Sequence, residues 1–313
     1  MKFWVGVTDN DWYKFLSQLQ PDEVNFWQPS GRPPFKKEIE IFLFKLHSPL
    51  NYIAGGGYFM RYSDLPMTIA WEAFQEKNGV SSFQDFRSKI IKYRRSNNKP
   101  DVPNPNVGCS ILLEPFFFKR EDWIPIPEDW KLNIVQGKTY NTETEIGNRL
   151  WLQVQENLKK VSSVSSNTLV DSSLDKLRPS GSGYGKSYSV NPRLGQGAFR
   201  VLITDIYQRK CAITGEKTLP ALEAAHIRNF AENGPHAPNN GILLRADLHR
   251  LFDGFYLTVT KNFQVEVSNR IKEEYENGRE YYALHGRKLY IPENPKYLPD
   301  NEYLEWHNSK FTG

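Results

Sequence analysis

Three of the six histidines in this 313-residue chain lie in one stretch, LEAAHIRNFAENGPHAPNNGILLRADLHRLFD, at residues 222–253. His226 precedes Asn240 by 14 residues, and His249 follows Asn240 by nine. A neutral imidazole can take a proton from water, and an Asn can hold that ring through its side-chain or backbone carbonyl. The spacing therefore fits hydrolysis of a phosphodiester, in which a divalent cation stabilises the phosphate and the leaving oxygen.

Asp253 stands four residues after His249. If a helix continues that far, both side chains project from one of its faces, where they can bind one cation together. The flanking patterns predict a strand over residues 219–227, a strand over 241–245 and a helix over 246–252. Strand, loop, strand and helix would form a compact site for a base and a metal.

The segments AAHI, NNGILL and LHRLFD resemble, in this order, the HNH nuclease pattern, also called ββα-metal. RLGQGAFR, KCAITGE, LTVT and NGREYYALHG extend the resemblance to the HNH domains of bacterial modification-dependent restriction endonucleases, over residues 193–311. The resemblance implies that His226 is the general base, that Asn240 orients it, and that His249 and Asp253 bind the cation. That cation would be Mg²⁺ or Mn²⁺, with Co²⁺ or Ni²⁺ as further candidates.

Two positions depart from the pattern. Many HNH enzymes have an Asp or His ligand immediately before the base, where this chain has Ala225. Glu223 would point to the same side of a strand as residue 225, so we expect it to supply the missing ligand, directly or through water. Some HNH domains hold zinc with two Cys-x-x-Cys pairs. Here Thr214 stands where Cys211 would need its partner, so no structural zinc is expected.

Other polar residues of this region have two interpretations. His236 lies in a loop rich in Gly and Pro and is expected to be a bystander, and His285 and His307 are expected to be structural. The other four could bind DNA phosphates, or else pack against the site or remain solvated: Gln196, Arg200, Arg228 and Arg250.

Length and composition limit the remaining possibilities. A mass of 36.4 kDa predicts about two domains, and hydrophobic residues make up 39% of the chain. The net charge of +4 and a pI near 8.8 fit an anionic partner. The start, MKFWVGVTDNDW, lacks the apolar segment of a signal peptide, and no apolar run is long enough to cross a membrane. We expect a bacterial cytoplasmic protein without a membrane contact.

We predict an α+β protein with three parts. Residues 1–160 form a recognition domain, residues 161–191 form a flexible linker rich in Ser and Gly, and residues 192–313 form the HNH domain.

The N-terminal part alternates short strands with helices, which suggests a small β-barrel or half-barrel with helices. Its segments FWVGVTDNDWYKFL, EIFLFKLHSPLNYIAGGGYF and LPMTIAW are similar in order to the EVE domain of the PUA-like superfamily, over residues 1–71. That group includes readers of modified bases. The three glycines at 55–57 predict either a bulge or a close approach of the backbone to a nucleotide.

Reading a modified base requires flipping it into an aromatic pocket, where stacking offsets the cost of unstacking. NFWQPSG, at residues 25–31, brings a Trp, an amide and a tight turn together. The expected pocket residues, any of which could instead be core, are Trp12, Trp27, Gln28, Tyr58 and Trp71, with Phe26 as a further ring.

RSKIIKYRRSNNK, at residues 87–99, holds six basic and no acidic residues. We expect Lys92, Arg94 and Arg95 to bind the DNA backbone, unless the segment is only a solvated helix face.

The sequence thus predicts a metal-dependent endonuclease for double-stranded DNA that carries 5-methylcytosine or 5-hydroxymethylcytosine. A nuclease directed to phosphorothioate DNA and a non-catalytic reader of modified bases or RNA with a degenerate HNH fold are the alternatives. Because one chain carries one HNH site and a double-strand cut needs two sites or two nicks, we expect a homodimer.

Overall fold

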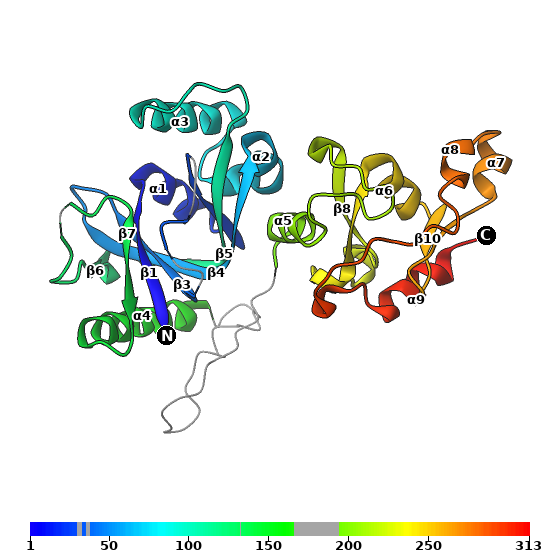
Figure 1. The fold of residues 1–313 in the computed structure, drawn as a ribbon. Helices are drawn as coiled ribbons and strands as arrows, with labels where there is room; N and C mark the ends of the chain where they lie inside the picture. Colours follow the sequence, from blue (N-terminus) through cyan, green and yellow to red (C-terminus); the bar gives the residue numbers. More distant parts are fainter. Residues whose placement is uncertain (30–32, 36–37, 132, 166–193) are drawn as a thin grey trace. The chain divides into compact units, whose positions relative to one another are not determined.

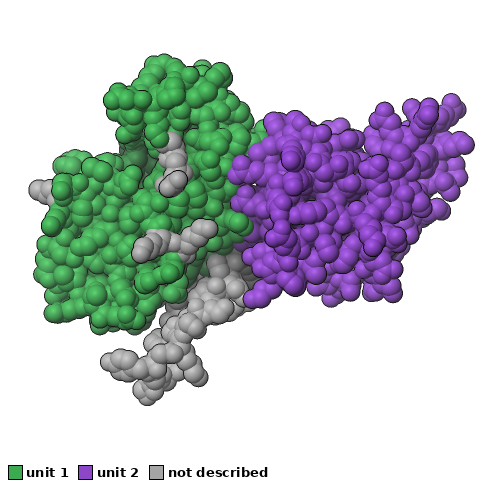
Figure 2. All heavy atoms as spheres, viewed as in Figure 1, with its two compact units in different colours: residues 1–193 green, residues 194–313 purple. Residues whose placement is uncertain are grey.

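The computed structural model describes residues 1–29, 33–35, 38–131, 133–165 and 194–313. Its internal contacts divide the chain into two compact units, Met1–Arg193 and Leu194–Gly313 (Figure 1, Figure 2). Helices and strands occur in both units, which confirms the mixed α+β class. None of the helices within the described ranges combines the length and apolarity that a membrane crossing requires.

The predicted linker lies largely outside the described residues. Its first residues, 161–165, continue helix α4 (Glu145–Ser165), whereas residues 166–191 are among those that the structure does not describe. The three predicted domain boundaries therefore stay predictions.

A seven-stranded mixed sheet is the frame of the first unit. The strand order is β2, β5, β4, β3, β1, β7, and β6 pairs with β4 beside this path. β1 and β3 pair in parallel, and the other recorded pairs are antiparallel. Over the described residues β2 and β7 end the ladder, so closure into a PUA-like barrel stays a prediction. The strands are β1 (Lys2–Thr8), β2 (Glu23–Gln28), β3 (Ile41–Leu46), β4 (Tyr52–Pro66), β5 (Asn106–Phe117), β6 (Ile124–Pro125) and β7 (Gly137–Asn141).

Helices α1 (Asn10–Leu19) and α4 cover opposite faces of this sheet (Figure 1). Trp12 packs edge-on against Phe44 of β3 with ring centroids 5.3 Å apart, whereas Trp151 packs against Phe3 of β1 on the other face at 5.8 Å. Both faces of these strands are apolar because both are covered, which explains the continuous hydrophobic runs of β1 and β3. The helices are α1 (Asn10–Leu19), α2 (Met67–Phe74), α3 (Phe83–Ser96) and α4.

The glycines of β4 allow close contact between strands. A Cβ at Gly56 would lie 2.5 Å from the carbonyl oxygen of Phe42 in β3, and the register with β5 shifts between Gly56 and Tyr58. The bulge predicted for residues 55–57 is therefore confirmed, and the backbone that approaches there is the neighbouring strand.

The second unit is built on β8, β9 and α6. The two strands pair antiparallel, with His226 opposite Gly241, and α6 begins directly after β9. Ala225, Ile242 and Phe252 from these three elements are fully buried in one core. The strand predicted at 241–245 is confirmed, and β8 is shorter than its predicted range. The elements are α5 (Gln196–Ile206), β8 (Leu222–His226), β9 (Gly241–Arg245), α6 (Ala246–Asp253), β10 (Leu257–Val259), β11 (Val265–Val267), α7 (Arg270–Tyr275), α8 (Arg279–Tyr282) and α9 (Asn301–Lys310).

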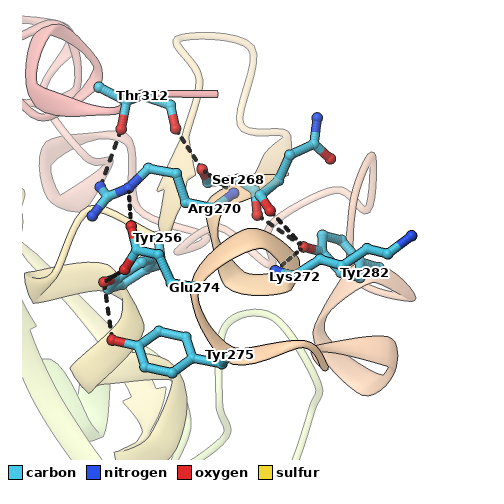
Figure 3. Close-up of polar contacts among 9 residues, drawn as sticks. Tyr256, Ser268, Arg270, Lys272, Glu274, Tyr275, Tyr282 and Thr312 are labelled. Atoms are coloured by element: carbon cyan, nitrogen blue, oxygen red, sulfur yellow. Dashed lines mark hydrogen bonds and ion pairs between the residues drawn. The ribbon is translucent and has the colours of Figure 1, made fainter.

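Polar contacts around α7 join the end of the chain to the segment before β10 (Figure 3). The Arg270 guanidinium donates to Glu274 at 2.8 Å and to the hydroxyl of Thr312 at 3.1 Å, and it lies over the ring of Tyr256 at 4.5 Å. The Tyr256 hydroxyl donates to Glu274 at 2.5 Å. A cation held between a carboxylate and an aromatic face fixes α7 against the β10 side of the unit.

Candidate active site

His226 lies at the end of β8, where its ring is held by α5. The phenyl ring of Phe199 stacks on the imidazole with centroids 4.0 Å apart and planes 11° apart. Gly241, opposite His226, makes this possible, because a Cβ there would lie 2.5 Å from Ile203 and 2.8 Å from the Phe199 ring. The sequence alone did not indicate this contact between Phe199 and His226.

The surroundings of His226 favour its neutral form. Burial, and after it the proximity of His236 and His249, lowers its pKa to about 4. An imidazole with this pKa is unprotonated at pH 7, so it has a lone pair available to accept a proton.

Asn240, at the end of a 3₁₀ turn before β9, is fully buried. Its Oδ1 accepts the backbone N–H of Arg228 at 2.9 Å, and its Nδ2 donates to the carbonyls of Arg228 at 3.0 Å and Pro235 at 2.9 Å. The side chain therefore fastens both ends of the loop between residues 228 and 235. None of these side-chain hydrogen bonds reaches His226 itself.

His236 is part of the site, although its loop composition predicted a bystander. Its Nδ1 lies 2.9 Å from Nε2 of His226, and the two ring centroids are 4.9 Å apart. The sequence held no clear signal for this contact, because His236 meets His226 only where Asn240 fastens Arg228 and Pro235 together.

His249 lies between two carboxylates. Its Nδ1 is 2.6 Å from Oε2 of Glu223, and its Nε2 is 3.3 Å from Oδ2 of Asp253. Burial raises the pKa of Asp253, the neighbouring Glu223 raises it further, and His249 opposes both. The structure thus brings together all three residues that were predicted as metal ligands.

The donor geometry allows two of the three to share one ion. Ligands at about 2.1 Å from a cation lie about 3 Å apart when they are adjacent in its shell, which the 3.3 Å between His249 and Asp253 matches. Glu223, in contrast, is at the opposite ring nitrogen, and the two nitrogens of one imidazole point away from each other. Glu223 and Asp253 therefore cannot both join His249 directly on a single ion in this arrangement, and the prediction that Glu223 supplies a ligand, directly or through water, stays a prediction.

Within the described ranges, no group of three or more His, Cys, Asp or Glu side chains is arranged to hold a metal ion. His249 and Asp253 offer one nitrogen and one oxygen donor. Such a pair fits a cation that completes its coordination with water and substrate phosphate oxygens, as Mg²⁺ commonly does.

The two positions that depart from the HNH pattern, Ala225 and the turn after Cys211, are filled by packing and closed by backbone hydrogen bonds. Ala225 is fully buried in the core of the unit, so a methyl group fills the position before His226. Cys211 is also fully buried. Its N–H donates to the carbonyl of Glu216 at 2.8 Å, and the Gly215 N–H donates to the Cys211 carbonyl at 2.9 Å. Backbone hydrogen bonds thus close this turn.

The polar residues around the site differ in exposure. Gln196 and Arg250 are exposed, whereas Arg200 and Arg228 are half-buried. Arg228 donates through Nε to the carbonyl of Glu232 at 2.8 Å, and its guanidinium lies 5.8 Å from the ring centre of Trp306.

His285 and His307 are structural, as expected. Nδ1 of His285 accepts the backbone N–H of Val267 at 3.2 Å. His307 is buried, stacks on Phe252 at 3.8 Å and donates from Nε2 to the Phe252 carbonyl at 3.0 Å. It therefore supports the end of α6, next to Asp253.

The predicted base-pocket residues of the first unit do not form one cluster. Trp12 is buried against Phe26 and Phe44. Trp27, the neighbour of Phe26 in β2, points to the opposite face of the sheet. There its indole N–H donates to the Asn78 carbonyl at 2.9 Å. Trp12 is therefore a core residue, Trp27 packs against the same hydrophobic cluster, and a base pocket that includes both stays a prediction.

Trp27 and Trp71 do lie close to a common residue. Their rings are 5.5 Å and 5.9 Å from Phe86 of α3, and both are half-buried. Gln28 is half-buried at the end of β2, and Tyr58 is buried in β4. Of the rings predicted for the pocket, Trp27 and Trp71 are thus the half-buried ones that pack near Phe86.

The basic residues of α3 also separate into two kinds. Arg94 is only 8% exposed and donates to the carbonyls of Pro29 at 3.2 Å and Pro100 at 3.0 Å. The Arg94 guanidinium is buried and occupied by these two hydrogen bonds, which argues against the predicted contact of Arg94 with DNA. Lys92 is exposed, and Arg95 is exposed and paired with Asp101 at 2.7 Å.

Solved structures show weak similarity to the chain, and no curated protein matches it at a significant level. A ZmASCH mutant protein from Zymomonas mobilis is 9% identical with a TM-score of 0.35, over 49% of this chain and 99% of that one. A structure described as a modification-dependent TagI restriction endonuclease is 13% identical with a TM-score of 0.28, over 93% of this chain and 76% of that one. At these scores neither similarity assigns a fold or an activity.

One protein-family model matches the chain, and the match lies within the second unit. Residues 211–260 match the family described as HNH_2, HNH endonuclease. The matched segment contains His226 on β8, Asn240 in the turn before β9, and His249 and Asp253 on α6. The chain therefore contains an HNH endonuclease domain.

Proposed function

We propose that this protein is a modification-dependent DNA endonuclease that protects a bacterial cytoplasm from phage DNA. The observation that supports it most directly is the position of a neutral histidine, His226, in the same strand–strand–helix unit as the His249–Asp253 pair. A base and a two-donor cation site are the parts that phosphodiester hydrolysis needs.

The chemical step follows from these roles. His226 removes a proton from a water molecule while the water oxygen forms a bond to phosphorus. The bond from phosphorus to the leaving bridging oxygen breaks, and solvent returns a proton to that oxygen. A divalent cation at His249 and Asp253 would stabilise the negative charge on the phosphate and leaving oxygen. Stacking on Phe199 keeps the His226 ring in place through the step.

Glu223 acts on His249 in this proposal. By accepting the Nδ1 proton, it fixes the tautomer in which Nε2 carries a lone pair beside Asp253. The residue expected as a ligand thus becomes the group that orients one. Mg²⁺ and Mn²⁺ are the proposed ions, with Co²⁺ and Ni²⁺ as substitutes.

The first unit is proposed to select modified DNA, in an EVE-like, PUA-like manner. Trp27 and Trp71 are half-buried around Phe86, so each has ring surface on which a flipped base could stack. Gln28 follows Trp27 and could bind the base edge. The proposed base is 5-methylcytosine or 5-hydroxymethylcytosine.

The DNA backbone is proposed to contact the exposed cations Lys92 and Arg95 of the first unit and Arg250 of the second, with Gln196, Arg200 and Arg228 beside the site. A double-strand cut requires two HNH sites, so we propose that the protein acts as a homodimer on DNA.

The test is competition among matched duplexes that are unmodified, methylated, hydroxymethylated or phosphorothioated, with Mg²⁺ or Mn²⁺ present. We expect cleavage of the cytosine-modified duplexes and its loss in His226→Ala. Preferential cleavage of the phosphorothioated duplex would replace the proposed substrate and leave the nuclease in place. Cleavage by His226→Ala at the wild-type rate would refute the proposed active site.

A further inference from the structure

We propose that His236 is the positioning residue of the general base, accepting the Nε2 proton of His226 and leaving His226 Nδ1 to receive the proton of water. This inference rests on the proposed function of His226. It gives His236 the orienting task that the HNH resemblance implies for Asn240.

The contact itself allows two proton arrangements. Nε2 of His226 and Nδ1 of His236 are 2.9 Å apart, a hydrogen bond that holds one proton when both rings are neutral. If His226 donates, its Nδ1 has the lone pair and can act as a base. If His236 donates, Nδ1 of His226 carries the proton and cannot accept another. Catalysis by His226 with this hydrogen bond intact therefore requires His236 to be the acceptor.

The loop holds His236 in position from both sides. The Asn240 side chain donates to the carbonyl of Pro235 at 2.9 Å, and the Asn240 backbone N–H donates to the carbonyl of Ala237 at 2.9 Å. The Asn240 carbonyl accepts the N–H of Ile227, the residue after His226, at 3.0 Å. One buried asparagine thus sets the distance between the two histidines.

The hydrogen bond becomes stronger as the reaction proceeds. When His226 takes the proton of water it becomes an imidazolium, and its Nε2–H then donates to a neutral ring as a charged donor. A contact that strengthens in the transition state raises kcat with little effect on substrate binding. Phe199 holds the ring by its face and His236 by its edge, so the two contacts restrict different motions.

The kinetic test uses the full chain and three variants. His236→Ala removes the acceptor and should lower kcat on the order of 100-fold with KM little changed. In His236→Asn, an amide oxygen can occupy nearly the place of Nδ1, so much of the rate should return. His285→Asn is the matched control, because His285 also accepts through Nδ1 but from the backbone N–H of Val267, and it should cut at the wild-type rate.

A second measurement does not depend on cleavage. In ¹⁵N NMR spectra of the wild-type protein, with the His226 signal assigned through His226→Gln, we expect protonated Nε2 and unprotonated Nδ1. In His236→Ala the tautomer preference should weaken. A wild-type His226 protonated at Nδ1, or a folded His236→Ala that keeps the wild-type kcat, overturns the inference. A wild-type protein that cuts no duplex refutes the proposed function instead, and the spectra still show which ring donates.

Discussion

Phe199 stacks face to face on His226, with ring centroids 4.0 Å apart and planes only 11° from parallel. The phenyl ring comes from α5, which begins 30 residues before the histidine, and Gly241 leaves the space for it. The ring of His226, the proposed base, is therefore oriented by an apolar contact from an element outside the strand–strand–helix unit.

Replacing Phe199 with Leu should weaken catalysis more than folding. A leucine keeps the site apolar but offers no flat surface to the imidazole, so we expect kcat to fall about 10-fold and stability to fall by about 1–2 kcal/mol. Steady-state kinetics and urea unfolding measure the two effects. Ile203→Val, one turn further along α5, removes buried volume from the same helix and should change stability without a comparable loss of kcat.

Glu223→Gln should raise the Mn²⁺ concentration needed for half-maximal binding by about 10- to 100-fold, because the tautomer of His249 is no longer fixed by a carboxylate. Asp253→Asn should have the larger effect, since it removes the charged donor beside Nε2. Mn²⁺ titration followed by electron paramagnetic resonance measures binding without DNA. Glu266→Gln in β11 is the control, and equal losses in all three variants would contradict the assignment.

Arg94 and Arg95 should respond differently to truncation, although they are neighbours in α3. Arg94→Ala leaves the carbonyls of Pro29 and Pro100 without their donor and should cost about 1–3 kcal/mol of stability. Arg95→Ala and Lys92→Ala should leave stability nearly unchanged. Each should reduce the slope of log K against log salt for DNA binding by about one. A salt slope unchanged by both would place the DNA elsewhere.

Acid should destabilise the second unit through His307. Burial lowers the pKa of this histidine to about 4, whereas in the unfolded chain it titrates near 6.5. Between these values the unfolded state binds more protons, so stability should fall as the pH falls from about 6.5 to about 4, by roughly 3 kcal/mol in total for this group. His226, whose pKa is also lowered to about 4, should add to the same trend.

His307→Gln isolates that contribution. The glutamine amide can still donate to the Phe252 carbonyl but does not titrate, so unfolding midpoints in urea between pH 4 and 7 should vary less than in the wild type. A variant with the same pH dependence as the wild type would show that His307 is not the responsible group.

Local sequence determined much of the second unit. The spacing of His226, Asn240, His249 and Asp253, with the apolar patterns around them, predicted two strands and a helix because these features depend on residues close together in the chain. The start of α1 is also set by neighbouring residues, because Asp9 caps the helix by accepting the Trp12 N–H at 2.9 Å. Local sequence also predicted the bulge at residues 55–57, where side chains larger than hydrogen would collide with neighbouring strands.

Only the tertiary structure decided which side chains meet. Three results of long-range packing are the contact of Glu223 with Nδ1 of His249, the burial of Trp12 in the core, and the hydrogen bonds of Arg94 to two carbonyls. Sequence identifies residues that are capable of chemistry, whereas burial and hydrogen-bond geometry select among them, and both depend on segments far apart in the chain. His236 shows this most clearly, since this loop histidine contacts His226 where Asn240 fastens Arg228 and Pro235 together.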